Sequence, residues 1–117
     1  MPEDAARSPR LTPPIFQILL ALSGGPLHGL GIADEVEAFT DGAVVLPPGT
    51  LYRSLKVMSH AGLIREIRAK DPGADPRRRV YGLTGAGRAA LEVDALHYDR
   101  LARLARKRGI LPAPAHS

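Results

Sequence analysis

The hydrophobic positions near the start of the chain follow the period of a helix. Pro13 and Pro14 come first, in the initial turn where a helix tolerates proline. Apolar side chains then recur at the i, i+3, i+4 and i+7 positions of one face, namely Ile15, Ile18, Leu19 and Leu22. Residues 23–26, with the sequence SGGP, end the pattern. The spacing therefore predicts a first helix with one buried face.

Two more helices are predicted before the middle of the chain. The second runs from about His28 or Leu30 to Phe39, and its inward positions are Ile32, Val36 and Phe39. The third covers residues 51–61, after two prolines, and Thr50 or Gly49 is expected to cap it. Gly62 is well placed for the left-handed turn that ends it.

The third helix divides into two faces. Its apolar positions repeat at i, i+4 and i+7 and should point into the core: Leu51, Leu55 and Met58. Polar and basic side chains occupy the rest of its surface: Tyr52, Arg53, Lys56, Ser59 and His60. We therefore expect a helix that is apolar behind and basic in front.

The second half of the chain predicts a hairpin and a long helix. Residues 63–68 and 79–83 have the composition of strands, and the turn formers of residues 71–76 lie between them. Thr84 is expected to cap a last helix that reaches about Lys107, although Gly85 and Gly87 weaken its first turn.

The last helix carries apolar residues in a heptad-like spacing. The seam consists of Leu91, Ala95, Tyr98, Ala102 and Ala105, with Leu101 and Leu104 beside it. A helix of about 36 Å is longer than so small a domain can cover, and an exposed apolar seam is typical of an interface. We therefore expect a homodimer whose interface includes Ile15, Leu19, Leu91, Tyr98 and Leu101.

The order of the elements predicts the fold class. Helix, helix, helix, hairpin is the order of a winged helix-turn-helix, a mainly α fold with a small β-hairpin as its wing. The expected organisation is a flexible arm at residues 1–10, a DNA-binding domain at 11–83, a C-terminal dimerisation helix at 84–108 and a flexible tail at 109–117.

The clustering of charge, rather than the overall composition, indicates a class of partner. The 117 residues carry 16 Lys and Arg against 12 Asp and Glu, a net charge of +4. Arginines gather at residues 77–79 and near the end of the last helix, and such clusters attract polyanions, most often nucleic acid. The chain has no cysteine and no apolar run long enough to span a membrane, so we expect a soluble cytoplasmic protein.

Four short motifs carry a resemblance to a known family. They are HGLGI at residues 28–32, PGTLYRSL at 48–55, GLI at 62–64 and RVYGLTGAG at 79–87. In this order and spacing the chain resembles the PadR-like transcriptional regulators over residues 11–104. The resemblance implies a dimeric DNA-binding repressor with a single C-terminal dimerisation helix, in which the PGTLY motif opens the recognition helix.

The expected DNA contacts lie on the third helix and on the wing. With that helix in the major groove, the contacting residues would be Thr50, Tyr52, Arg53 and Lys56. Arg53 is the candidate for bidentate recognition of guanine, and Lys56 for a phosphate. The wing would contact phosphates or a narrow minor groove through Arg77, Arg78 and Arg79. The alternative is that Tyr52 packs against the second helix and Arg53 is merely solvated.

Two other functions compete with DNA binding. Catalysis has little support, because the histidines at 28, 60, 97 and 116 lack a metal-ligand spacing and the acidic residues of the second helix have the pattern of a solvated face. We expect neither metal nor cofactor. A winged-helix protein-interaction module is the stronger alternative, but it should present apolar or acidic residues where this chain has Tyr52, Arg53 and Lys56. A small-molecule effector, if one acts, is expected near Ile15, Leu19, Tyr98 and Leu101.

Overall fold

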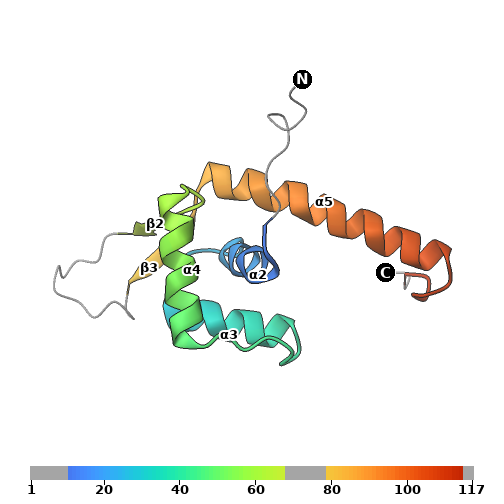
Figure 1. Cartoon of the computed structure of the whole chain (residues 1–117), viewed down its shortest axis with the longest axis horizontal. Coiled ribbons are helices and arrows are strands. Elements are labelled where there is room, and N and C mark those ends of the chain that lie inside the picture. Colours follow the sequence, from blue (N-terminus) through green and yellow to red (C-terminus); the bar gives the residue numbers. More distant parts are fainter. Residues whose placement is uncertain (1–10, 68–78, 115–117) are drawn as a thin grey trace, which may run out of the picture.

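The computed structural model describes residues 11–67 and 79–114 and confirms the predicted order of elements (Figure 1). The elements are α2 (Pro13–Leu22), β1 (Leu27–His28), α3 (Gly29–Phe39), α4 (Pro48–His60), β2 (Ile64–Ile67), β3 (Val80–Leu83) and α5 (Gly85–Lys107). The predicted arm at residues 1–10 and turn at residues 71–76 lie outside the described residues. The fold is a winged helix-turn-helix followed by a long C-terminal helix.

The sheet contains a strand that the sequence did not predict. β1 joins β3, and β3 joins β2, so the antiparallel sheet has the order β1–β3–β2. Leu27 lies opposite Tyr81, and His28 lies opposite Val80. A two-residue strand is too short to show an alternating pattern, and its hydrogen-bonding partner lies far away in the sequence. Local periodicity therefore carries no signal for β1.

Side chains cap three of the helices, and α4 begins differently. Thr12, His28 and Thr84 each accept a backbone N–H of the first helical turn that follows them. α4 instead begins at Pro48 with Pro47 as its cap residue and no capping side chain. The expectation that Thr50 or Gly49 caps this helix is therefore wrong. Proline is suited to the first helical position because its φ is already helical and its missing N–H needs no partner there.

The core lies where α2, α3 and α4 meet the sheet. Its buried apolar residues come from α2, α3, α4 and α5 and from β2 and β3, including Ile18, Leu19, Ile32, Val36, Leu51, Leu55, Met58, Ile64, Tyr81 and Leu91. The predicted inward face of α4 is confirmed. Phe39 corrects the prediction for α3, because its side chain is 43% exposed at the end of the helix.

The start of α5 is fixed against the end of α4 through Thr84 and Gly87. The Thr84 hydroxyl accepts the N–H of Gly87 at 3.0 Å and lies 2.6 Å from the carbonyl oxygen of Gly62 and 2.9 Å from that of Leu63, so it can donate to either. A Cβ at Gly87 would overlap the Leu63 carbonyl and lie 2.9 Å from the Leu83 side chain. Gly87 therefore permits an approach that no other residue allows.

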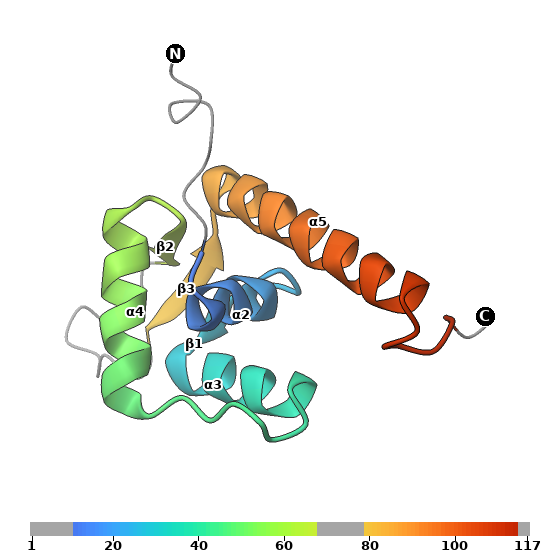
Figure 2. The same ribbon diagram turned by 45° about the vertical axis from the view of Figure 1, so that its right-hand side comes forward.

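The first half of α5 packs on α2, and its second half extends beyond the other elements (Figures 1 and 2). Asp94, a buried carboxylate, accepts the N–H of Leu11 at 3.0 Å, just before α2 begins. One turn later Tyr98 meets Phe16 of α2 in an edge-to-face contact, with ring centroids 4.7 Å apart. These contacts set the direction in which α5 leaves the domain.

The structure corrects part of the expected dimer surface. Leu19 and Leu91 are buried within the single chain, so they have almost no surface to offer to a partner. They belong to the core, and their assignment to the interface is wrong. Tyr98 and Leu101 remain exposed, as do Leu96 and Leu104. Ile15 is half-buried.

Replacing Gly87 by alanine should destabilise the fold. The added methyl group meets the Leu63 backbone, and such overpacking costs about 1–3 kcal/mol of unfolding free energy. Gly85→Ala is the matched control: it lies two residues away in the same helix with open space around its Cβ position, and alanine should leave stability unchanged or raise it. Urea unfolding followed by circular dichroism compares the two. Equal stabilities of the two variants would contradict the close approach.

Candidate nucleic-acid interface

The outer face of α4 is exposed and basic because its other face is buried. Leu51, Leu55 and Met58 fix the helix against the core, so the side chains about half a turn away point to solvent. Arg53 and Lys56 are exposed on this outer face, and Ser59 and His60 follow them towards the C-terminal end of the helix. Thr50 lies in the first turn and is half-buried.

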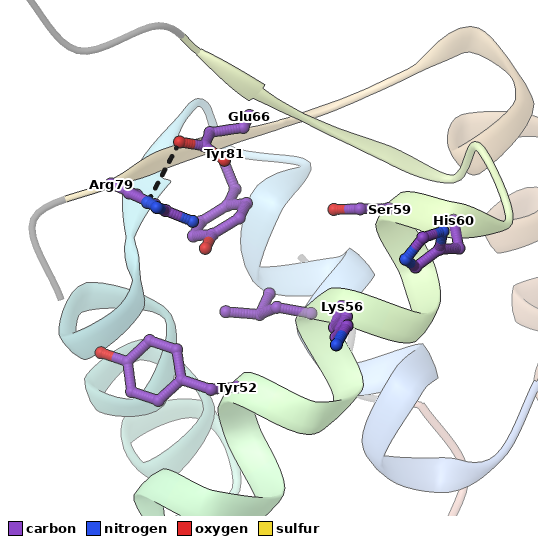
Figure 3. Close-up of a pocket in the computed structure, with 8 residues that line it drawn as sticks. Tyr52, Lys56, Ser59, His60, Glu66, Arg79 and Tyr81 are labelled. Carbon is purple, nitrogen blue, oxygen red and sulfur yellow. Dashed lines mark ion pairs between the residues drawn. The ribbon is translucent and has the colours of Figure 1, made fainter. Parts of the chain in front are cut away.

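Tyr52 does not share the orientation of Arg53. Its hydroxyl oxygen is buried without a hydrogen-bond partner among the described residues. A Cβ at Gly29 would lie 2.8 Å from this oxygen, so the first residue of α3 must be small for the ring to pack there. Figure 3 shows the ring directed away from Lys56, Ser59 and His60 and towards α3. The packing alternative holds for Tyr52, and the expectation that its hydroxyl is free to contact DNA is corrected.

A cleft of about 580 Å³ lies between α4 and the wing formed by β2 and β3. We call it the α4–wing cleft. It is lined by Tyr52, Leu55, Lys56, Ser59, His60, Glu66, Arg79 and Tyr81 (Figure 3). The cleft thus joins the basic face of the helix to the base of the wing. A strand of polyanion lying along α4 would pass beside both.

Strand register places three polar side chains of the wing together in this cleft. Glu66 is directly opposite Tyr81, and Arg79 stands two positions before Tyr81, on the same side of the pleat. The Nε of Arg79 lies 3.3 Å from a carboxylate oxygen of Glu66, and both side chains are nearly half exposed. Glu66 was not predicted from the sequence, because its pairing with Arg79 depends on the register between β2 and β3.

The Tyr81 hydroxyl remains protonated at physiological pH. Burial removes the phenolate from water and raises the pKa of this group above 10.0, and the negative charge of Glu66 raises it further, whereas Arg79 acts in the opposite direction. Desolvation is the largest of these effects. A neutral phenol can donate a hydrogen bond to an anionic oxygen, so Tyr81 adds a donor to the cations around the cleft.

The wing arginines are only partly described. Arg77 and Arg78 lie outside the described residues, and Arg79 reaches the α4–wing cleft, where it pairs with Glu66. The structure thus brings Lys56 and Arg79 to one cleft from two elements far apart in the sequence. Arg53 is exposed on α4 but is not among the residues that line the cleft.

An apolar groove of about 600 Å³ lies elsewhere on the molecule, between α2, the end of α4 and the start of α5. Its walls are Leu11, Thr12, Ile15, Val57, Met58, Ala61, Leu63, Ala86, Ala89, Ala90 and Val93. Of the residues expected around an effector, Ile15 lies in this groove, whereas Leu19 is in the core and Tyr98 packs on Phe16.

Residues 11–67 and 79–114 show neither a metal-binding cluster nor a membrane-spanning helix. Within these ranges, His, Asp and Glu side chains do not gather into a group of three that could hold a metal ion. None of the helices described there is both long and apolar enough to cross a membrane.

Comparison with known proteins adds independent information. Residues 18–93, more than half of the chain, match the Transcriptional regulator PadR-like family. A curated relative, an uncharacterized 37.1 kDa protein in transposon TN4556 of Streptomyces fradiae, is 37% identical over 84 residues. This stretch covers 72% of the present chain but only 22% of that protein, so the chain spans about a fifth of its relative's length.

Solved structures of similar fold include bacterial transcription regulators. A PadR family transcription regulator from Clostridium difficile is similar with a TM-score of 0.65 and 24% identity, over 80% of this chain and 94% of that one. A transcriptional regulator from Clostridium thermocellum gives a TM-score of 0.65 and 22% identity, over 80% of this chain and 86% of that one. At these identities the structures support the fold. With the sequence match over residues 18–93, they show that the chain belongs to the PadR-like family of transcriptional regulators.

Proposed function

We propose that this regulator is a repressor that binds a pseudo-palindromic operator as a homodimer, in the cytoplasm and without a catalytic role. The observation that carries the proposal is the exposed basic face of α4 beside the α4–wing cleft. Residues 11–83 would read DNA, and α5 would join two copies. The resemblance to the PadR-like family implies a dimeric repressor, and it therefore supports repression rather than activation.

In the proposed complex, α4 enters the major groove and the wing follows the neighbouring backbone. Arg53 is the candidate for a bidentate contact with guanine, because it is exposed and outside the cleft. Lys56 and Arg79 would meet phosphates at the cleft, together with Arg77 and Arg78 of the wing. Thr50 would contact the backbone near the helix start. Tyr52 would act by packing α4 against α3 at Gly29.

The surface of α5 supports the homodimer. Its second half exposes Leu96, Tyr98, Leu101 and Leu104, and Ile110 and Leu111 follow the helix. A row of exposed large apolar side chains on a helix that extends from the domain is typical of an interface. A two-fold dimer would place two α4 helices about 34–36 Å apart, one turn of DNA. An effector that prefers one relative orientation of these helices would shift DNA binding.

A protein-interaction module remains the second candidate, and the character of α4 argues against it. Exposed Arg53 and Lys56 carry positive charge where a protein-binding face should be apolar or acidic. The apolar groove beside α5 lies away from this face.

Replacing Arg53 by alanine should weaken binding to the operator about 5- to 150-fold and relax discrimination at one base pair, because a bidentate contact with guanine is lost. Lys56→Ala should weaken binding to operator and to random DNA alike. It should also reduce the slope of log affinity against log salt by about the contribution of one phosphate contact. Mobility shifts on a duplex selected by the wild-type protein from a random pool measure both. Arg88→Ala, at an exposed position near the start of α5 and outside the cleft, is the control and should leave the operator affinity nearly unchanged. Unchanged operator affinity in Arg53→Ala would contradict the assigned contact.

Replacing Leu101 by aspartate should convert the dimer into a monomer, because the charge would be buried in the apolar interface. Leu101 is 48% exposed in the single chain, so the fold itself should survive. Leu30→Asp, at an α3 leucine with 51% exposure, is the matched control and should leave the mass unchanged. Light scattering after gel filtration gives the mass directly. A wild-type monomer, or a Leu101→Asp dimer, would be the contrary result.

A further inference from the structure

Glu66 introduces a negative charge into a site that otherwise suits a phosphate. Among the described residues that line the α4–wing cleft, it is the one carboxylate, whereas Lys56 and Arg79 are cations and Tyr81 is a neutral donor. Its carboxylate does not project freely into solvent but lies 3.3 Å from the Nε of Arg79. The cleft cation that comes from the wing is thus already paired in the free protein.

The placement of Glu66 follows from the strand geometry. Along β2, Ile64 and Glu66 share one side of the pleat, and Ile64 is buried while Glu66 is exposed. Along β3, Tyr81 and Arg79 continue the same side, so this surface changes from apolar near the core to charged at the cleft. The carboxylate and the guanidinium therefore meet where α4 faces the wing (Figure 3).

An ion pair of this exposure is easily exchanged. Both side chains are close to half exposed, and pairs in such surroundings are screened by water and contribute little to stability. A DNA phosphate offers the guanidinium an equivalent anionic acceptor, in a site flanked by Lys56. The carboxylate would then lie beside the phosphate and repel it unless the side chain turns away.

We propose that Glu66 restrains DNA binding by holding Arg79, so that a backbone phosphate enters the α4–wing cleft only when the guanidinium exchanges the carboxylate for the phosphate. This inference rests on the proposed DNA-binding function and assigns a regulatory role to a residue that does not itself contact DNA. Glu66 acts through Arg79 and lowers the net positive charge of the cleft in the free protein.

The test is a double-mutant cycle on the full chain. The probes are a duplex selected by the wild-type protein from a random-sequence pool and an unselected duplex of equal length. Glu66→Gln should tighten binding to the selected duplex about 3- to 10-fold, because the pair is released and the like charge beside the phosphate is removed. The slope of log affinity against log salt should steepen by up to about 0.9, the value for one further phosphate contact.

The Arg79→Ala background decides whether Glu66 acts through Arg79. Arg79→Ala alone should weaken binding, and Glu66→Gln should gain clearly less affinity in the Arg79→Ala background than in the wild type, because only the repulsion of the phosphate is then relieved. Glu92→Gln, the same chemical change on α5, controls for net charge and should alter affinity less than 2-fold, an expectation for an exposed charge outside the cleft.

Each outcome bears on one of the two proposals. No gain in Glu66→Gln, or a gain that persists undiminished without Arg79, would overturn the restraining role while leaving DNA binding in place. Failure of the wild-type protein to retain any DNA from the pool would overturn the proposed function, and the role of Glu66 with it. Glu66 is exposed and outside the core, so the variant should retain the wild-type fold, which circular dichroism checks.

Discussion

The close approach of α5 to the end of α4 is the contact on which the functional arrangement depends. At Gly87 the backbone of α5 reaches the Leu63 carbonyl, and the Thr84 hydroxyl binds the end of α4 and the first turn of α5 at the same place. The sheet enters this junction through Leu83. The start of α5, the element proposed to join two copies, is therefore in direct contact with the turn that follows α4, the element proposed to read DNA.

The two faces of α4 differ in their surroundings. The inner face, with Leu51, Leu55 and Met58, fixes the helix in the core, and the outer face is left to Arg53 and Lys56. Tyr52 belongs to neither, since its ring packs on Gly29 at the start of α3. A basic helix held rigidly at both its end and its back can present its side chains in one geometry, which sequence recognition requires.

The wing carries a carboxylate, Glu66, beside its cation Arg79. Arginine in the wing attracts DNA of any sequence, and such unselective attraction is unfavourable for a regulator that must find one site among many. In the proposed arrangement, the carboxylate paired with Arg79 would reduce that attraction in the free protein. Tyr81, buried and protonated, lines the same cleft without adding a charge of its own.

The sequence was sufficient to predict the helices, the hairpin strands and the basic face of α4, because helical periodicity, proline positions and turn residues act over a few neighbouring positions. It also predicted the Thr84 cap and the turn at Gly62, both confirmed. It could not place β1, the buried hydroxyl of Tyr52 or the Arg79–Glu66 pair, and it assigned Leu19 and Leu91 to an interface although they lie in the core. Only the tertiary structure decided these points. Each depends on which distant segments meet, and periodicity shows that a side chain is turned inward without showing what covers it.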